Sequence, residues 1–188
     1  MARLLHKVQE AGIKTSIDVV SDSTADYKAK ILPSLKYSDY VIINEIESSM
    51  LSDLPAYTDG KLNIDNICKT MQIIASYGVK EKVIIHAKQV GVCLDVATNT
   101  FTVVPSLNIP SDEIKGSVGA GDAYCAGCLY GLYNNYDDKK LLEFASAAAC
   151  NLFAENSVDG MLDRIGIEKL QTKYERKSIR LEKIIQNK

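Results

Sequence analysis

The chain has 188 residues, of which 46% are hydrophobic and 24% charged, a composition typical of a globular domain and not of a disordered chain. Its net charge of −2 argues against a nucleic-acid-binding protein, which usually presents a basic face. No segment approaches the ~18–20 apolar residues that span a bilayer, and residues 1–7 lack the apolar core of a secretory signal, so we expect a cytoplasmic protein without membrane or nucleic-acid partners.

Helical and strand patterns alternate along the chain. In the first half we expect a helix over 2–11, a strand over 15–20, a short helix containing Ile31 and Leu35, a strand over 40–43, a helix opening at Asn44, a helix over 64–77 and a strand over 82–86. In the second half we expect a hairpin with strands 93–96 and 101–104, helices over 123–132 and 139–154, and a charged surface helix over 166–188. This alternation predicts an α/β fold with a parallel sheet covered on both faces.

The five cysteines give an odd count without the spacing of a disulfide framework. Cys125 and Cys128 form one C-x-x-C pair, but a zinc site needs a second pair or histidines at matching spacing. The two histidines, His6 and His86, are distant from that pair in the sequence. We therefore interpret the pair as two small thiols on a buried helix face.

The segment from Gly116 to Gly127, which reads G-S-V-G-A-G-D-A-Y-C-A-G, carries the strongest chemical signal. Glycines at 116, 119 and 121 precede a helix rich in small side chains, which implies close backbone approach. The start of a helix offers N–H groups without helical partners and the positive end of its dipole. The segment therefore predicts an anion site.

Two other glycine-rich motifs are excluded by their spelling. In a Walker A loop, Asp122 and Ala123 would have to be Lys and Ser or Thr. In a dinucleotide fingerprint, Tyr124 would have to be a small residue. What remains is a backbone phosphate site with a carboxylate beside it, suited to Asp122 accepting the proton of a hydroxyl that attacks a phosphoryl group. The alternative is a tight turn in which Asp122 is an ordinary helix cap.

The run V-G-A-G-D-A over 118–123, followed by Ala126-Gly127, resembles the carboxy-terminal signature of the ribokinase-type (pfkB) carbohydrate kinases. The resemblance implies a Rossmann-like three-layer αβα fold and an ATP- and Mg²⁺-dependent kinase acting on a sugar or sugar-like substrate. It implies that Gly119, Ala120 and Gly121 form the anion hole, that Asp122 is the catalytic base, and that Val118 lies at the nucleotide.

A second match is the N-x-x-E pair formed by Asn44 and Glu47, which family members use to organise Mg²⁺, partly through water, and the phosphates. Mg²⁺ prefers oxygen ligands and keeps several waters, so the chemistry is consistent. The alternative is a helix cap with acids in the first turn. The helix ending near Asn151 resembles the family's last core helix, which borders the adenine pocket, so we expect Asn151 to contact the nucleotide. Its alternative is a polar residue on an exposed helix face.

The chain departs from the family pattern in three places. Gly116 stands where many members have an Asp that helps bind a monovalent cation, which leaves K⁺ dependence open. The run His86-Ala87-Lys88 stands where relatives often have a Thr-x-Gly segment. Family members also carry an amino-terminal region with most sugar contacts and a lid, for which 188 residues leave no room. We therefore expect one partial domain over 1–188, the amino-terminal part and lid missing, that associates through an exposed sheet edge, for instance as a homodimer.

Three functions are compatible with these features to different degrees. The first is an ATP-dependent sugar kinase or its catalytic part, and the second is a relic that binds nucleotide or a partner without turnover. The third, a dinucleotide-dependent oxidoreductase, is disfavoured by the spelling of the glycine loop. The identity of the sugar is not encoded in the residues available.

Overall fold

The structure is a computed structural model, and it describes residues 1–21, 26–150 and 160–179. The contacts divide the chain into two compact units. Unit 1 holds residues 1–87 and 92–101, and unit 2 holds 88–91 and the described residues of 102–179. None of the described helices is long and apolar enough to cross a membrane.

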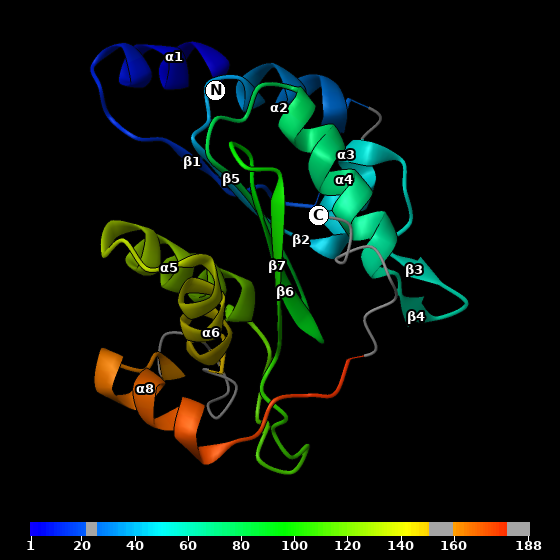
Figure 1. Ribbon diagram of the computed structural model, residues 1–188, viewed down its shortest axis with the longest axis vertical. Coiled ribbons are helices and arrows are strands. Elements are labelled where there is room, and N and C mark those ends of the chain that lie inside the picture. The colour runs from blue at the N-terminus through cyan, green and yellow to red at the C-terminus, as the bar shows by residue number, and fades with distance from the viewer. Residues whose placement is uncertain (22–25, 151–159, 180–188) are drawn as a thin grey trace. The chain divides into compact units, whose positions relative to one another are not determined.

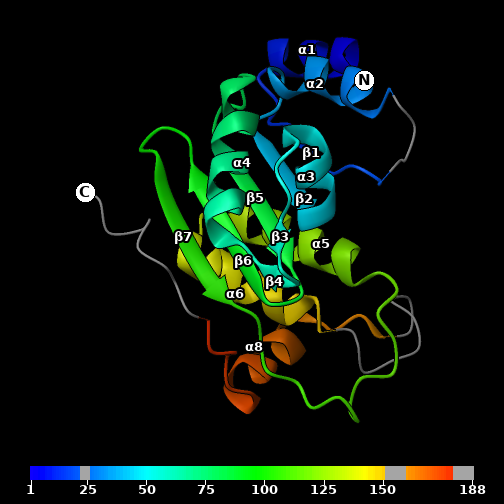
Figure 2. The same ribbon diagram turned by 90° about the vertical axis from the view of Figure 1, so that its right-hand side faces the viewer.

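Unit 1 alternates helices and strands along the chain. Its elements are α1 (Ala2–Glu10), β1 (Ser16–Ile17), α2 (Tyr27–Leu35), β2 (Tyr40–Asn44), α3 (Glu45–Ser52), β3 (Tyr57–Thr58), β4 (Lys61–Leu62), α4 (Ile64–Ser76) and β5 (Lys82–Ala87). Helices α3 and α4 pack on each other and on the strands beside them (Figures 1 and 2). The apolar runs of the two central strands, 41–43 and 83–85, are almost completely buried, which is typical of parallel strands covered on both faces.

The main sheet has the strand order β1-β2-β5-β6-β7, where β6 is Val90–Asp95 and β7 is Thr100–Pro105. The first three strands are parallel, with Asn44 in register with His86. A connection of two residues, 88–89, joins β5 to β6, and a link this short fits only an antiparallel pair. The sheet is therefore mixed: the expected parallel part is present, and the predicted hairpin forms its last two strands.

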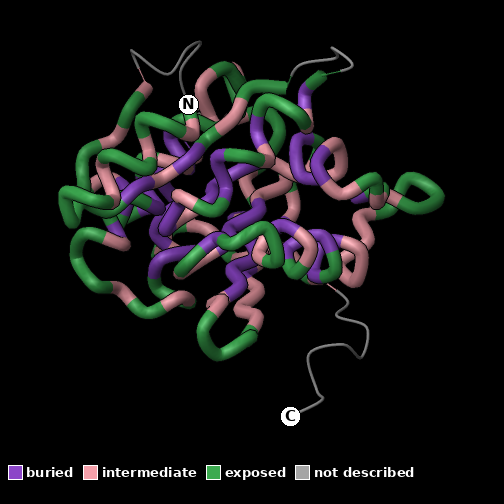
Figure 3. Tube along the Cα trace, turned by 90° about the horizontal axis from the view of Figure 1, so that it is seen from above, coloured by how far each residue is buried: buried purple, intermediate pink, exposed green. Residues whose placement is uncertain are grey.

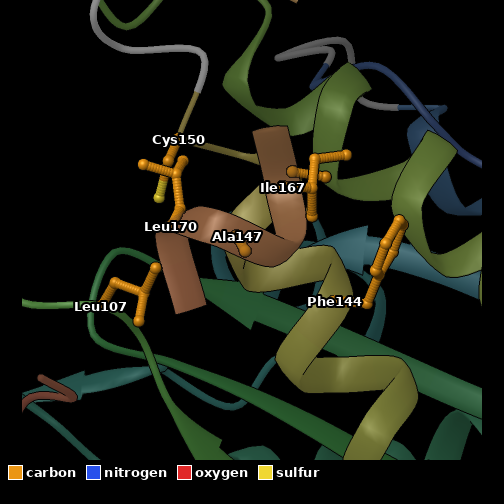
Figure 4. Close-up of a cluster of buried hydrophobic side chains, with 7 residues drawn as sticks. Leu107, Phe144, Ala147, Cys150, Ile167 and Leu170 are labelled. Carbon is orange, nitrogen blue, oxygen red and sulfur yellow. The ribbon is translucent and has the colours of Figure 1, made fainter. Parts of the chain in front are cut away.

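Unit 2 contains α5 (Ala120–Tyr133), α6 (Asp138–Ala148) and α8 (Arg164–Lys173), which pack together in Figures 1 and 2. One hydrophobic cluster joins α6, α8 and Leu107, the second residue after β7 (Figure 4). Figure 3 colours the trace by burial, and many of its outer loops are exposed. The cluster consists of Leu107, Phe144, Ala147, Ala148, Cys150, Ile167 and Leu170.

Several expected boundaries differ from the structure. The strand expected over 15–20 is only Ser16–Ile17, because the Asp18 carboxylate accepts the backbone N–H of Val19 and Val20 is exposed. The helix expected over 139–154 ends at Ala148. The charged helix expected over 166–188 ends at Lys173, with Ile167 and Leu170 buried, and 174–179 continue without helix.

The sequence interpretation missed the two-stranded sheet of β3 and β4, whose strands are antiparallel. Asp59 and Gly60 form its turn, both with positive φ (51° and 72°). An Asp-Gly turn between short strands is a strong hairpin signal, so the sequence did contain the information.

Candidate active site

The glycine loop ends in a left-handed residue at the start of α5. Gly119 has φ of 78° and is the N-cap, and its carbonyl accepts the first helical hydrogen bond, from the Ala123 N–H, at 2.9 Å. The helix begins at Ala120, three residues before the predicted start, so Asp122 is its third residue. The N–H groups of Gly121 and Asp122 lie in the first turn, where no earlier helical carbonyl can accept them.

Asp122 is exposed and is the only acid in the first turn of α5. The carboxylate lies at the positive end of the helix dipole, beside the N–H groups of the first turn. The loop before it is open as well, since the Val118 side chain is 72% exposed. The first turn thus offers N–H donors and a carboxylate acceptor side by side, the combination that the sequence predicted.

The small residues of α5 have a packing role. A Cβ on Gly127 would come within 2.8 Å of the Ala145 Cα and 2.9 Å of the Ala148 Cβ. The close backbone approach expected for this part of the motif is therefore an approach of α5 to α6. Cys128 is buried and Cys125 half-buried, and both are reduced cysteines.

In unit 1, Asn44 and Glu47 form a complete capping box at the start of α3. The Asn44 Oδ1 accepts the N–H groups of Ile46 and Glu47, both at 2.9 Å, and the Glu47 carboxylate accepts the Asn44 N–H at 3.1 Å. This box accounts for the N-x-x-E spacing by local backbone chemistry. The metal role of the pair remains a prediction.

Glu47 is nevertheless an unusual cap residue, because it is buried. Burial is the main cause that raises the pKa of its carboxyl, opposed by the hydrogen bonds from Asn44 and from the Ser21 hydroxyl, while the negative charge of Asp18 raises it further. The Ser21 Oγ donates to the second carboxylate oxygen at 3.1 Å. Two carboxylates within electrostatic range would both be stabilised by a divalent cation.

Sequence reasoning missed Asp18 and Ser21. Asp18 directly follows β1 as Asn44 ends β2, and the two strands are parallel. Since the carboxyl ends of parallel strands meet at one edge of a sheet, this succession was the available signal. Among the residues that the structure describes, no cluster of three or more His, Cys, Asp or Glu side chains could hold a metal by itself. A cation held partly through water, as expected for Mg²⁺, does not need such a cluster.

His86 is the last residue but one of β5 and lies opposite Asn44 in the register, and burial lowers its pKa to about 4. Lys88, which lies in unit 2, has an exposed side chain, and its carbonyl accepts a hydrogen bond from the Lys177 Nζ at 3.0 Å. His86 is thus part of the strand, and the Lys88 carbonyl holds Lys177. Neither residue is assigned to a ligand.

Unit 2 also has an apolar cavity of about 200 Å³. Its walls come from α5, α6 and the segment 161–167, and the Tyr130 and Phe144 rings in the wall stack at 4.9 Å. Ala123, next to Asp122, is part of the lining.

Asn151, expected at the nucleotide, lies outside the described residues. The two groups of predicted residues thus belong to different units: Asn44 and Glu47 to unit 1, Val118 to Asp122 to unit 2.

Comparison with known proteins gives one family. Residues 2–161 match the model of the pfkB family carbohydrate kinases. A 5-dehydro-2-deoxygluconokinase of Geobacillus thermodenitrificans is 34% identical over 91 residues, which are 47% of this chain and 25% of that protein. The corresponding kinase of Geobacillus kaustophilus is 34% identical over 83 residues, 43% of this chain and 23% of that protein.

Among solved structures, the ribokinase of Arabidopsis thaliana complexed with ribose and ATP superposes with a TM-score of 0.73 at 21% identity. The similarity covers 90% of this chain and 51% of that chain. At this identity the similarity shows the ribokinase-type fold. The chain thus spans about half the length of that ribokinase and about a quarter of the curated relatives that it matches.

Proposed function

Because the chain belongs to the pfkB family of carbohydrate kinases, we propose that it is the catalytic, nucleotide-binding part of an ATP-dependent sugar kinase with Asp122 as general base. The observation that carries this proposal is the first turn of α5. There, Gly119 in the left-handed conformation starts a helix whose unpartnered N–H groups and exposed Asp122 carboxylate are neighbours.

In the proposed reaction, a sugar hydroxyl attacks the γ-phosphorus of ATP while Asp122 accepts its proton. The new bond joins the sugar oxygen to phosphorus, and the bond from phosphorus to the oxygen of the leaving ADP breaks. Charge on the transferred phosphoryl oxygens is stabilised by the N–H groups at the start of α5, around Gly119, Ala120 and Gly121.

For the magnesium ion that a nucleotide brings, we assign Asn44 and Glu47, with Asp18 as an added carboxylate. The support is the buried Glu47 carboxyl, whose pKa is raised by burial and by the Asp18 charge, and the oxygen character of these groups. Bound Mg²⁺ would neutralise phosphate charge. The oxygens of Glu47 already accept from Ser21 and Asn44, so contact through water fits them better than a direct bond.

For the nucleotide base we assign the apolar cavity of unit 2. A flat aromatic base fits a site of about 200 Å³ lined by apolar side chains and the Tyr130 and Phe144 rings. Ala123 lies in the lining and directly follows Asp122, so the cavity begins where the proposed phosphate site ends along the helix. Val118 and Asn151 stay in this assignment as predictions.

For the substrate, the curated relatives are 5-dehydro-2-deoxygluconokinases, which makes a keto-deoxy sugar acid the first compound to test. Ribose belongs in the same panel, since the Arabidopsis structure holds it.

The test is transfer of the ATP γ-phosphate to this panel by the wild type and by Asp122→Asn. Loss of the base should lower the rate by about 10²-fold or more. Asp138→Asn is a matched control, because it also removes a carboxylate from the first turn of a helix, α6, that has no glycine loop. Equal rates for wild type and Asp122→Asn would contradict the assignment of the base.

A second candidate is nucleotide binding without turnover. It is favoured by one observation, that the capping box of Asn44 and Glu47 accounts for the N-x-x-E spacing without a ligand. Calorimetric binding of ATP with Mg²⁺, together with no transfer to any sugar, would support it. Preferential binding of NAD would exclude both candidates.

A further inference from the structure

A short segment that begins at the last residue of α8, residues 173–177, runs along the residues that follow β7. We name it the strap. The Asn108 N–H donates to the Glu175 carbonyl at 2.8 Å, and the Lys177 N–H donates to the Ser106 carbonyl at 2.9 Å. Leu107 and Arg176 form an antiparallel bridge between these bonds. The strap is thus held by backbone pairing with residues that are distant from it in sequence.

The strap contacts the loop that leads into the glycine motif. The Tyr174 hydroxyl donates to the Glu113 Oε2 at 2.5 Å, and the Lys173 Nζ donates to the same oxygen at 3.1 Å. Glu113 lies three residues before Gly116. The Tyr174 ring also packs against the hydrophobic cluster of unit 2, so this anchor is attached to the core.

The strap is also tied to the end of β7. The Arg176 NH1 donates to the Pro105 carbonyl at 2.7 Å. The strap therefore contacts Pro105, the residues that follow β7 and Glu113, all of which precede the glycine motif in sequence.

We propose that the strap positions the glycine loop: Glu113, held by Lys173 and Tyr174, fixes the amino-terminal end of the segment that contains Gly119 to Asp122. This inference rests on the proposed function for its consequence, since a fixed loop keeps the N–H groups of the helix start in the geometry that binds phosphate. Glu113 and Tyr174 act through the loop and are positioning residues.

The experiment compares Glu113→Gln, Tyr174→Phe and their double variant in the full chain, by hydrogen exchange of residues 111–123 and by calorimetric titration with ATP and Mg²⁺. Each single variant should speed exchange in this segment and weaken ATP binding by about fivefold or more, while the midpoint of thermal unfolding changes little. Because both variants break the same contact, the double variant should resemble the single ones.

Asp112→Asn is the matched control, since it removes an exposed carboxylate from the same loop, one residue from Glu113. It should leave both measurements at their wild-type values. Unchanged exchange of 111–123 in Glu113→Gln and Tyr174→Phe, fully additive effects in the double variant, or an equal effect of Asp112→Asn would each overturn the proposal. If the wild type binds no ATP, the proposed function fails, and hydrogen exchange alone still decides the role of the strap.

Discussion

The hydroxyl oxygen of Tyr124 lies against Gly91, so closely that a Cβ added to Gly91 would be 2.1 Å from it. Only a glycine leaves room for this contact, which joins the start of β6 to α5 just after Asp122. The contact therefore brings the backbone of β6 against a side chain of the first turns of α5, within unit 2.

Gly91→Ala should therefore destabilise the protein by about 1–3 kcal/mol, the usual cost of overpacking a buried site. Urea denaturation followed by circular dichroism measures this change. The double variant Gly91→Ala/Tyr124→Phe, which removes the clashing oxygen, should recover much of the loss. A double variant no more stable than Gly91→Ala would show that this contact is not the cause.

The two glycines of α5 that face α6 should respond differently to alanine. A Cβ on Gly127 meets the Ala145 backbone at 2.8 Å, whereas one on Gly131 meets the flexible Leu141 side chain at 3.1 Å. We expect Gly127→Ala to lower the free energy of unfolding by roughly 1–3 kcal/mol. For Gly131→Ala, the gain in helix propensity of about 1 kcal/mol should offset most of the crowding. Thermal unfolding of both variants shows which of them is less stable. If Gly131→Ala were less stable than Gly127→Ala, the packing described would be contradicted.

Two variants of Asn44 can distinguish its structural role in the capping box from a role in ligand binding. Asn44→Ala should cost about 1 kcal/mol of stability, while Asn44→Ser, which keeps a capping oxygen, should cost a few tenths. The cap uses the amide oxygen. Both variants lack the amide nitrogen, so both should weaken Mg²⁺-dependent ATP binding if Asn44 also organises the phosphates. Titration with ATP at several Mg²⁺ concentrations tests this. Normal ATP binding by Asn44→Ser would show that Asn44 acts only as a helix cap.

His86 should make the fold sensitive to acid. Its pKa is lowered by burial from 6.5 to about 4, so between these values the unfolded chain binds a proton that the folded chain does not. Stability from this group is complete above the unfolded pKa and is lost as the pH falls through that range. His86→Gln should thus lose less stability than the wild type between neutral pH and pH of about 4. His6→Gln, at the exposed histidine of α1, is the control and should keep the wild-type pH dependence, as measured by urea denaturation.

Local patterns predicted most of the fold. The apolar runs of β2 and β5 and the glycine before α5 identified the strands and the helix start to within a few residues. The composition of the loop also predicted a carboxylate, Asp122, beside the N–H groups of a helix start, because glycines before a helix leave those groups open.

The remainder depends on contacts between distant residues. The pairing of Leu107 with Arg176, and of Glu113 with Tyr174, joins residues about 60–70 positions apart, and no periodicity within either segment encodes it. The burial of Glu47 likewise arises from elements that cover it and not from its own helix. The length of α8 was overestimated because charge and helix propensity continue past Lys173, while the strap pairing takes the backbone out of the helix.

The strap is also synthesised after the glycine loop that it contacts. A ribosome makes the glycine loop well before residues 173–177, and domains generally fold as their segments emerge. Until then Glu113 has neither Lys173 nor Tyr174 to bind, and Pro105 lacks the Arg176 guanidinium. A message cut short before Lys173 would therefore encode every residue of the G-A-G-D motif and yet release a loop with no anchor at its amino-terminal end.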